Sequence, residues 1–169
     1  GGWGFRQGRV VFARVGVGAL VTYLAVCTVS HFSAVGRVER MARELNLEVR
    51  IIGALPQPLS PFRWTGLALT PEGVYQGWFN VLESKPTEFR FFPSTQNAYV
   101  ARAGELPQVQ TYLWFARFPV VRYRRDGDRH IVEYGDQRFQ SSRDRGTRFS
   151  FRVIFDARGQ VLYRGFARP

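Results

Sequence analysis

The sequence has little of the residues that most often build disulfides and metal centres. Of its 169 residues, one is cysteine and two are histidine. A disulfide needs two cysteines, so no intrachain disulfide can form. The cysteine content therefore does not indicate whether the compartment is oxidising or reducing. A zinc site of the usual kind needs three or four Cys, His or carboxylate ligands, often at short spacing. His31 and His130 stand 99 positions apart, so we expect no metal or cofactor site in this segment.

The familiar motifs of catalysis are also missing. No serine lies in a Gly-x-Ser-x-Gly elbow, and neither a phosphate-binding glycine loop nor a dinucleotide fingerprint occurs. Cys27 falls inside an apolar run, where we expect an inert thiol. Asp126 and Asp128 belong to a predicted turn. The sequence therefore assigns no catalytic residue, and we expect this segment alone to lack catalytic activity.

Lysine is nearly absent, although the chain is strongly basic. The net charge is +11, carried by 23 arginines and one lysine against 13 acidic residues. The skew toward arginine is typical of GC-rich coding, so it is a poor binding signal by itself. A basic surface still favours anionic partners, such as lipid headgroups or nucleic acid. Arginine and aromatic residues mix near 89–92 and 148–151, but at the period of two that core strands demand, so we do not expect nucleic acid as a partner.

Asp, Glu, Lys and Arg are all absent from Val15 to Gly36, a run of 22 residues. Eighteen helical residues rise about 27 Å, close to the roughly 30 Å of a bilayer's hydrocarbon core. Arginines that can reach the headgroups flank the run on both sides: Arg6, Arg9, Arg14, Arg37, Arg40 and Arg43. The pattern predicts a transmembrane helix with its flanks in residues 1–36, and the lipid bilayer as a partner.

Two alternatives for this run stay open. A signal peptide also places basic residues before an apolar stretch. A buried helix of a soluble domain would tolerate the small and polar residues within the run. Gly18, Thr22, Ala25 and Val29 recur at helical spacing, and small residues let membrane helices approach closely. One explanation is that a membrane helix simply tolerates such residues; the other is a packing face, which implies partner helices, expected upstream in the same protein, that this chain does not supply.

Polarity within and around the run gives two further expectations. His31 lies near its end and is a candidate intramembrane polar site, the alternative being that it reaches water at the interface. Three arginines on each side leave the topology undecided by the positive-inside rule. A basic soluble domain favours the cytoplasmic face, where anionic lipids attract arginine.

The rest of the chain predicts an α+β domain. Apolar residues at helical spacing indicate an amphipathic linker helix at 37–48, which can continue the first helix, with Asn46 as its stop. Residues 49–169 alternate apolar and polar residues between tight turns, which predicts a mainly antiparallel sheet with one or two packed helices. One helix is expected at Pro107–Arg117, covering a sheet face and burying Leu113. The expected strands are 49–55, 64–69, 74–82, 88–92, 120–125, 130–134, 149–155 and 160–164.

Two local patterns are candidates for function. The connector before Trp64 contains Pro56, Pro58 and Pro61, which restrict its backbone. It is either a rigid strut that orients the soluble domain or a plain loop. Trp64 is either an interfacial anchor or a core residue. Asp136 and Arg138 lie two positions apart, so on a strand they share a face. Arg138 could contact an anionic ligand while Asp136 holds it, or the two form a structural salt bridge.

Four features in order resemble a known family. The basic helix that follows the apolar run comes first. The others are ALPQPLSPFRW at 54–64, VQTYLWFARFPVV at 109–121, and YGDQRFQ at 134–140 with FSFRVIFDARGQV at 149–161. Together they resemble the C-terminal part of the bacterial membrane-bound metal-dependent hydrolases, the group of LexA-regulated inner-membrane proteins.

This resemblance implies that the chain carries the last membrane helix and a soluble accessory domain of a bacterial inner-membrane protein. The chain begins Gly-Gly-Trp, and we expect it to continue a longer protein. The family's metal-binding histidines lie in its multi-helix membrane region, so a divalent metal is expected upstream. No position here matches them, and no ligand can be carried over. The alternative is a non-enzymatic, membrane-anchored binding or interaction domain.

Overall fold

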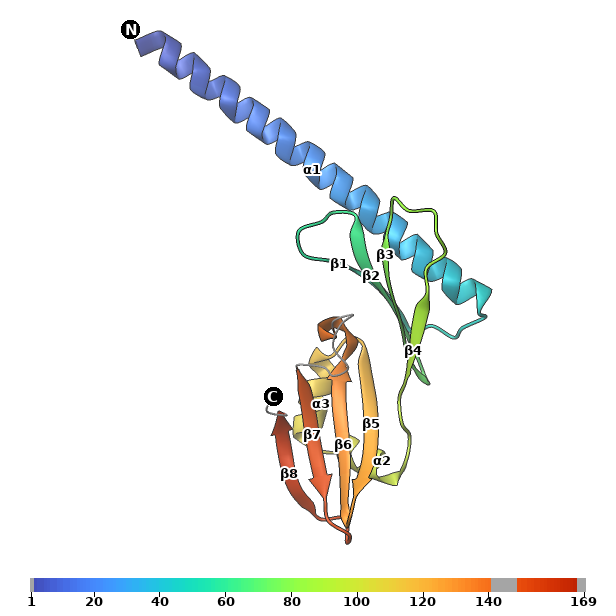
Figure 1. Ribbon diagram of the computed structural model, residues 1–169. Coiled ribbons are helices and arrows are strands. Elements are labelled where there is room, and N and C mark those ends of the chain that lie inside the picture. The colour runs from blue at the N-terminus through green and yellow to red at the C-terminus, as the bar shows by residue number, and fades with distance from the viewer. Residues whose placement is uncertain (1, 141–148, 167–169) are drawn as a thin grey trace.

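The computed structural model describes residues 2–140 and 149–166, with side chains from residue 10 onward. A single helix, α1 (Gly2–Glu44), occupies the first quarter of the chain and projects far beyond the rest of the molecule (Figure 1). It runs without a break through residues 36 and 37, because neither proline nor a local capping residue interrupts it there. The expected linker helix is thus the last part of α1.

The end of α1 has a clear local cause. Asn46 takes a left-handed conformation with φ 53°, which asparagine tolerates better than most residues. The N–H of Asn46 then donates to Arg43 O, and the N–H of Leu47 donates to Ala42 O at 2.9 Å. This pair of bonds satisfies the last carbonyls of a helix in a Schellman motif. The expected stop at Asn46 is confirmed.

The first sheet lies under the second half of α1. It contains β1 (Ile51–Pro56), β2 (Arg63–Thr70), β3 (Gly73–Asn80) and β4 (Phe89–Pro93), antiparallel and in that order. One face of the sheet packs against helix residues that include Ala34, Val38 and Met41. Gly66 of β2 permits this close approach: a Cβ there would lie 2.6 Å from Val38 Cγ2.

The opposite face of the first sheet packs against the start of the second half of the domain. Leu67 and Val74 form a buried cluster with Phe118 and Val120. Gly53 permits a close approach on this face, since a Cβ there would lie 2.7 Å from the Phe118 ring. β2 is therefore buried on both faces of the first sheet, with Leu67 and Ala68 fully buried on opposite sides.

The second sheet contains β5 (Pro119–Asp126), β6 (Arg129–Asp136), β7 (Ser150–Phe155) and β8 (Val161–Phe166), also antiparallel and in chain order. Two short helices, α2 (Ala98–Gly104) and α3 (Pro107–Phe115), cover one face of it (Figure 1). A 3-10 turn, η1 (Gln137–Phe139), follows β6. The core under the helices contains Val132, Tyr134, Phe151, Val153 and Phe155.

The α+β class is confirmed: a long apolar N-terminal helix precedes mainly antiparallel sheets and two short helices. The predicted hairpins pair as expected around residues 70–73, 126–129 and 156–160. Two details differ from the sequence-based expectation. Residues 49–166 form two four-stranded sheets, and α3 ends at Phe115 and buries Val109 and Tyr112, leaving Leu113 only partly buried.

The contact between α1 and the first sheet predicts that alanine at position 66 lowers the melting temperature, whereas alanine at position 104 does not. Gly66→Ala should lower the melting temperature of the detergent-solubilised chain, because overpacking typically costs about 1–3 kcal/mol. Val38 is fully buried and β-branched, so it cannot turn aside easily. Adding Val38→Ala should recover part of the loss, a coupling that marks direct contact.

Gly104→Ala is the matched control, since nothing lies within 4 Å of a Cβ at this helical position. It should leave the melting temperature unchanged or raise it slightly. Equal melting temperatures for the Gly66 and Gly104 variants, measured by circular dichroism, would contradict the packing of α1 on β2.

Candidate membrane-proximal site

The antiparallel order of the first sheet brings two connectors to the same end of it. β1 and β3 both run toward this end, so the β1–β2 connector (57–62) and the β3–β4 connector (81–88) lie there together. We call it the connector end. Beside it, Ala34 of α1 packs with Ala54 and Trp64. The connector end thus lies next to α1 where the charge-free run finishes.

Each connector presents a leucine to the outside. Leu59 is fully exposed and has a positive φ of 64°, a conformation that costs a leucine roughly 1–2 kcal/mol. Leu82 is 69% exposed. On α1 the same level carries exposed Val29 and Phe32. Exposed apolar side chains therefore occur on both connectors and on the part of α1 that ends beside them.

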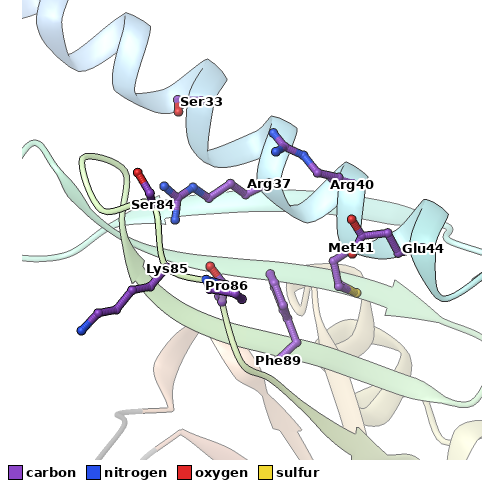
Figure 2. A pocket seen from close by; sticks show the side chains of 10 residues that line it. Ser33, Arg37, Arg40, Met41, Glu44, Ser84, Lys85, Pro86 and Phe89 are labelled. Atoms are coloured by element: carbon purple, nitrogen blue, oxygen red, sulfur yellow. The ribbon is translucent and has the colours of Figure 1, made fainter.

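A groove of about 520 Å³ lies between α1 and the β3–β4 connector. We call it the basic groove (Figure 2); it is lined by Ser33, Arg37, Arg40, Met41, Glu44, Ser84, Lys85, Pro86, Thr87 and Phe89. Three cations face one carboxylate in this set, which gives a local charge of 3 − 1 = +2. The chain's single lysine is among them.

Arg37 is held in place at the mouth of the basic groove. Its Nη2 donates to Val81 O at 3.1 Å and to Glu83 O. Its guanidinium also stacks over Phe79, 5.4 Å from the ring centroid. Figure 2 shows the side chain extending from α1 toward Ser84, while Phe89 rises from the sheet toward the helix. Both hydrogen bonds use Nη2, and a guanidinium has three further N–H groups on Nε and Nη1.

The predicted pair of Asp136 and Arg138 meets at the end of β6. Asp136 is fully buried, and its Oδ2 accepts from Arg138 Nε at 2.8 Å and Nη2 at 2.7 Å. The carboxylate also accepts from the backbone N–H groups of Arg117 and Arg138, both at 2.9 Å. Arg138 in turn donates to Phe115 O. This geometry ties the end of α3 and the segment before β5 to the end of β6 and η1, and it favours the structural salt bridge over an anion contact.

His31 and Trp64 lie together at the connector end. Their ring centroids are 5.4 Å apart, with His31 exposed on α1 and Trp64 buried in the core. The indole Nε1 donates to Pro61 O at 3.0 Å, so the proline-rich connector helps to fix the tryptophan. Among the described residues, no group of three His, Cys, Asp or Glu side chains could hold a metal ion. Cys27 lies on α1 as a free thiol.

A second hollow, of about 350 Å³, lies at the end of α3 and is mainly aromatic. Its lining comprises Gln108, Thr111, Tyr112, Phe115, Phe149, Phe151 and Phe166. Burial, followed by the nearby charge of Asp136, raises the pKa of Tyr112 above its ordinary value. Burial also raises the pKa of Tyr134, to about 12. Their hydroxyls donate to Phe149 O and Val100 O respectively.

Comparisons with family models, curated proteins and solved structures found no match to this chain.

The basic groove was not predicted from the sequence, although all three of its cations were noted in the sequence analysis for other reasons. Arg37 and Arg40 stood out only as flanks of an apolar run, and Lys85 only as the single lysine. The three come together because strand pairing returns the β3–β4 connector to α1. Within the sequence, the one available signal was a lysine placed in a chain that otherwise uses arginine.

The buried ion pair predicts a large loss of stability for Asp136→Asn. The substitution keeps the side chain's size but removes the charge that Arg138 faces and turns one acceptor into a donor. Breaking a buried pair typically costs roughly 3–5 kcal/mol. Asp126→Asn is the control, because Asp126 is 66% exposed in its pair with Arg124 and such pairs contribute about 0–1 kcal/mol. Chemical unfolding of both variants measures the difference, and equal midpoints would refute the structural role.

Stability should fall in strong alkali because of the buried tyrosines. In the unfolded chain Tyr134 ionises near pH 10, whereas in the fold its pKa is about 12. The stabilising contribution is therefore complete below pH 10 and is lost as pH rises toward 12, by up to about 1.4 kcal/mol per pH unit. Tyr134→Phe should flatten this slope of melting temperature against pH, and an unchanged slope would contradict it.

Proposed function

We propose that this chain is the membrane-anchoring C-terminal portion of an integral membrane protein that resembles the metal-dependent hydrolases. In this proposal α1 is the last transmembrane helix of a bacterial inner-membrane protein. The two sheets form its accessory domain, outside the bilayer. The observation that carries it is the division of α1 into two parts. Its most apolar stretch is long enough to cross a membrane and none of it is buried, whereas residues 34–42 pack tightly on the first sheet.

The exposed part of α1 supports a membrane setting over a soluble one. Val10, Phe12, Val15, Val17, Leu20, Val21 and Leu24 are each at least half exposed. In water, each such side chain forgoes part of the about 1.5–3 kcal/mol that full burial would provide. Contiguous apolar surfaces on this scale usually mark a membrane or a partner. The internal bonds from Thr22 Oγ1 to Gly18 O and Thr28 Oγ1 to Leu24 O satisfy two hydroxyls that lipid could not.

The accessory role rests on how the domain is joined to α1. The last part of α1 packs on one face of the first sheet without a break in the helix. In this proposal the helix therefore holds the domain at a fixed distance from the membrane. The catalytic residues and the divalent metal belong, in this proposal, to helices encoded upstream. The upstream coding sequence tests that part: several membrane helices bearing histidines support it. Their absence favours the alternative, a membrane-anchored binding domain.

Charges placed within α1 test the membrane setting. The chain expressed in bacteria should stay in the membrane pellet after alkaline carbonate extraction. Leu20→Arg with Leu24→Arg should release it, because each arginine at a helix centre disfavours insertion by about 2.5–3.5 kcal/mol. Ala101→Arg with Gln110→Arg adds the same charge at exposed positions of the soluble domain and should change nothing.

Two outcomes would overturn the proposal. Recovery of the unaltered chain in the carbonate supernatant would show that α1 does not span the membrane. Loss of the first part of α1 from the mature protein, read by intact mass, would show that it is a signal peptide.

A further inference from the structure

We propose that the basic groove binds the phosphate of an anionic phospholipid headgroup. The inference rests on the proposed function, since it needs α1 to span the bilayer beside the groove. It adds a specific lipid site to what would otherwise be a plain anchor. The ligand chemistry is a phosphodiester carrying net negative charge, attached to acyl chains.

The height of the groove is the first argument. Arg37 is the first charged residue after the 22-residue run, and Arg40 follows one turn later. With a rise of 1.5 Å per residue, both lie within about 6 Å of the end of the apolar segment. A headgroup layer is about 5–8 Å thick on each side of the hydrocarbon core. When α1 spans the bilayer, Arg37 and Arg40 therefore lie at the depth of lipid phosphates.

The arrangement of charge is the second argument. Arg37, Arg40 and Lys85 outweigh Glu44, the one acidic residue of the lining. Within residues 2–140 and 149–166, no carboxylate forms an ion pair with any of these three cations. Arg37 is already oriented by its bonds to Val81 O and Glu83 O, so little side-chain freedom is lost when it binds. Figure 2 shows Lys85 extending outward from the connector and away from α1. Its stem is flexible, so the ammonium group can turn toward a bound anion.

The apolar part of the lining is the third argument, and it favours a lipid over a free phosphate ion. Met41 of α1, Phe89 of β4 and Pro86 of the connector are the apolar members of the lining. A free phosphate ion gains nothing from these side chains, whereas the glycerol and upper acyl carbons of a lipid would cover them. Leu82, 69% exposed at the start of the same connector, is a further apolar side chain that a lipid could cover.

Lipid titration of the purified full chain tests the site. In a mild non-ionic detergent, native mass spectrometry measures the binding of phosphatidylglycerol and of phosphatidylcholine with the same acyl chains. The unaltered chain should bind phosphatidylglycerol more tightly. Arg40→Gln with Lys85→Gln should weaken that binding roughly 20- to 30-fold, about fivefold for each cation. Both residues are exposed, so the variant should fold as the unaltered chain does.

Arg122→Gln with Arg158→Gln is the matched control, since it removes two exposed cations far along the chain from the groove, one on β5 and one in the β7–β8 turn. It should bind phosphatidylglycerol as the unaltered chain does. Excess inorganic phosphate, added as a competitor, should fail to displace the lipid. Full displacement would overturn the lipid assignment in favour of a soluble phosphate ligand. Equal binding by the groove variant and the unaltered chain, or equal weakening in both variants, would overturn the site itself.

These outcomes are separable from failure of the proposed function. Carbonate extraction reports whether α1 spans the membrane, and the groove substitutions leave its apolar run intact. A chain that stays in the membrane but binds both lipids equally would refute only the groove. A chain that leaves the membrane would refute the anchor, whatever lipid it binds in detergent.

Discussion

The contact between Val38 of α1 and Gly66 of β2 fixes where the long helix lies on the first sheet. A side chain at position 66 would push the helix away, and the neighbouring clusters around Trp64 and Met41 would open with it. Because α1 is continuous, the same contact sets the height of the domain relative to the apolar run. The basic groove exists only at this spacing, since one of its walls is α1 and the other is the β3–β4 connector.

Local features of the sequence were enough to predict most single elements. Alternating apolar residues between Thr70-Pro71-Glu72-Gly73, Asp126-Gly127-Asp128 and Asp156-Ala157-Arg158-Gly159 predict hairpins, because glycine and aspartate accept the backbone conformations of tight turns. Gly127 and Gly159 have positive φ. Asn46 ends α1 for a related reason. These signals lie within a few residues of the structure they determine.

Features that depend on distant residues were not predictable in the same way. Hairpin patterns do not tell which hairpins share a sheet, so a single sheet was expected where two four-stranded sheets form. The division depends on Phe118, whose partner Gly53 lies 65 positions away. Leu113 was expected inside because it is apolar, but the stripe of α3 that faces the sheet carries Val109, Tyr112 and then Ala116. The seven-residue α2 is too short to show a helical period.

The start of β5 couples the two sheets through the alternation of a single strand. Val120 points into the cluster with Leu67 and Val74, while its neighbour Val121 packs against the helix-covered core of the second sheet. The backbone of Val121 also bonds to Ser94 Oγ and Thr95 N, in the segment that leaves the first sheet. Moving one sheet relative to the other would therefore disturb both cores at once. α1 packs on the first sheet, and β5 joins that sheet to the helix-covered core of the second. The position of α1 is therefore linked, through β5, to the core beside the aromatic hollow.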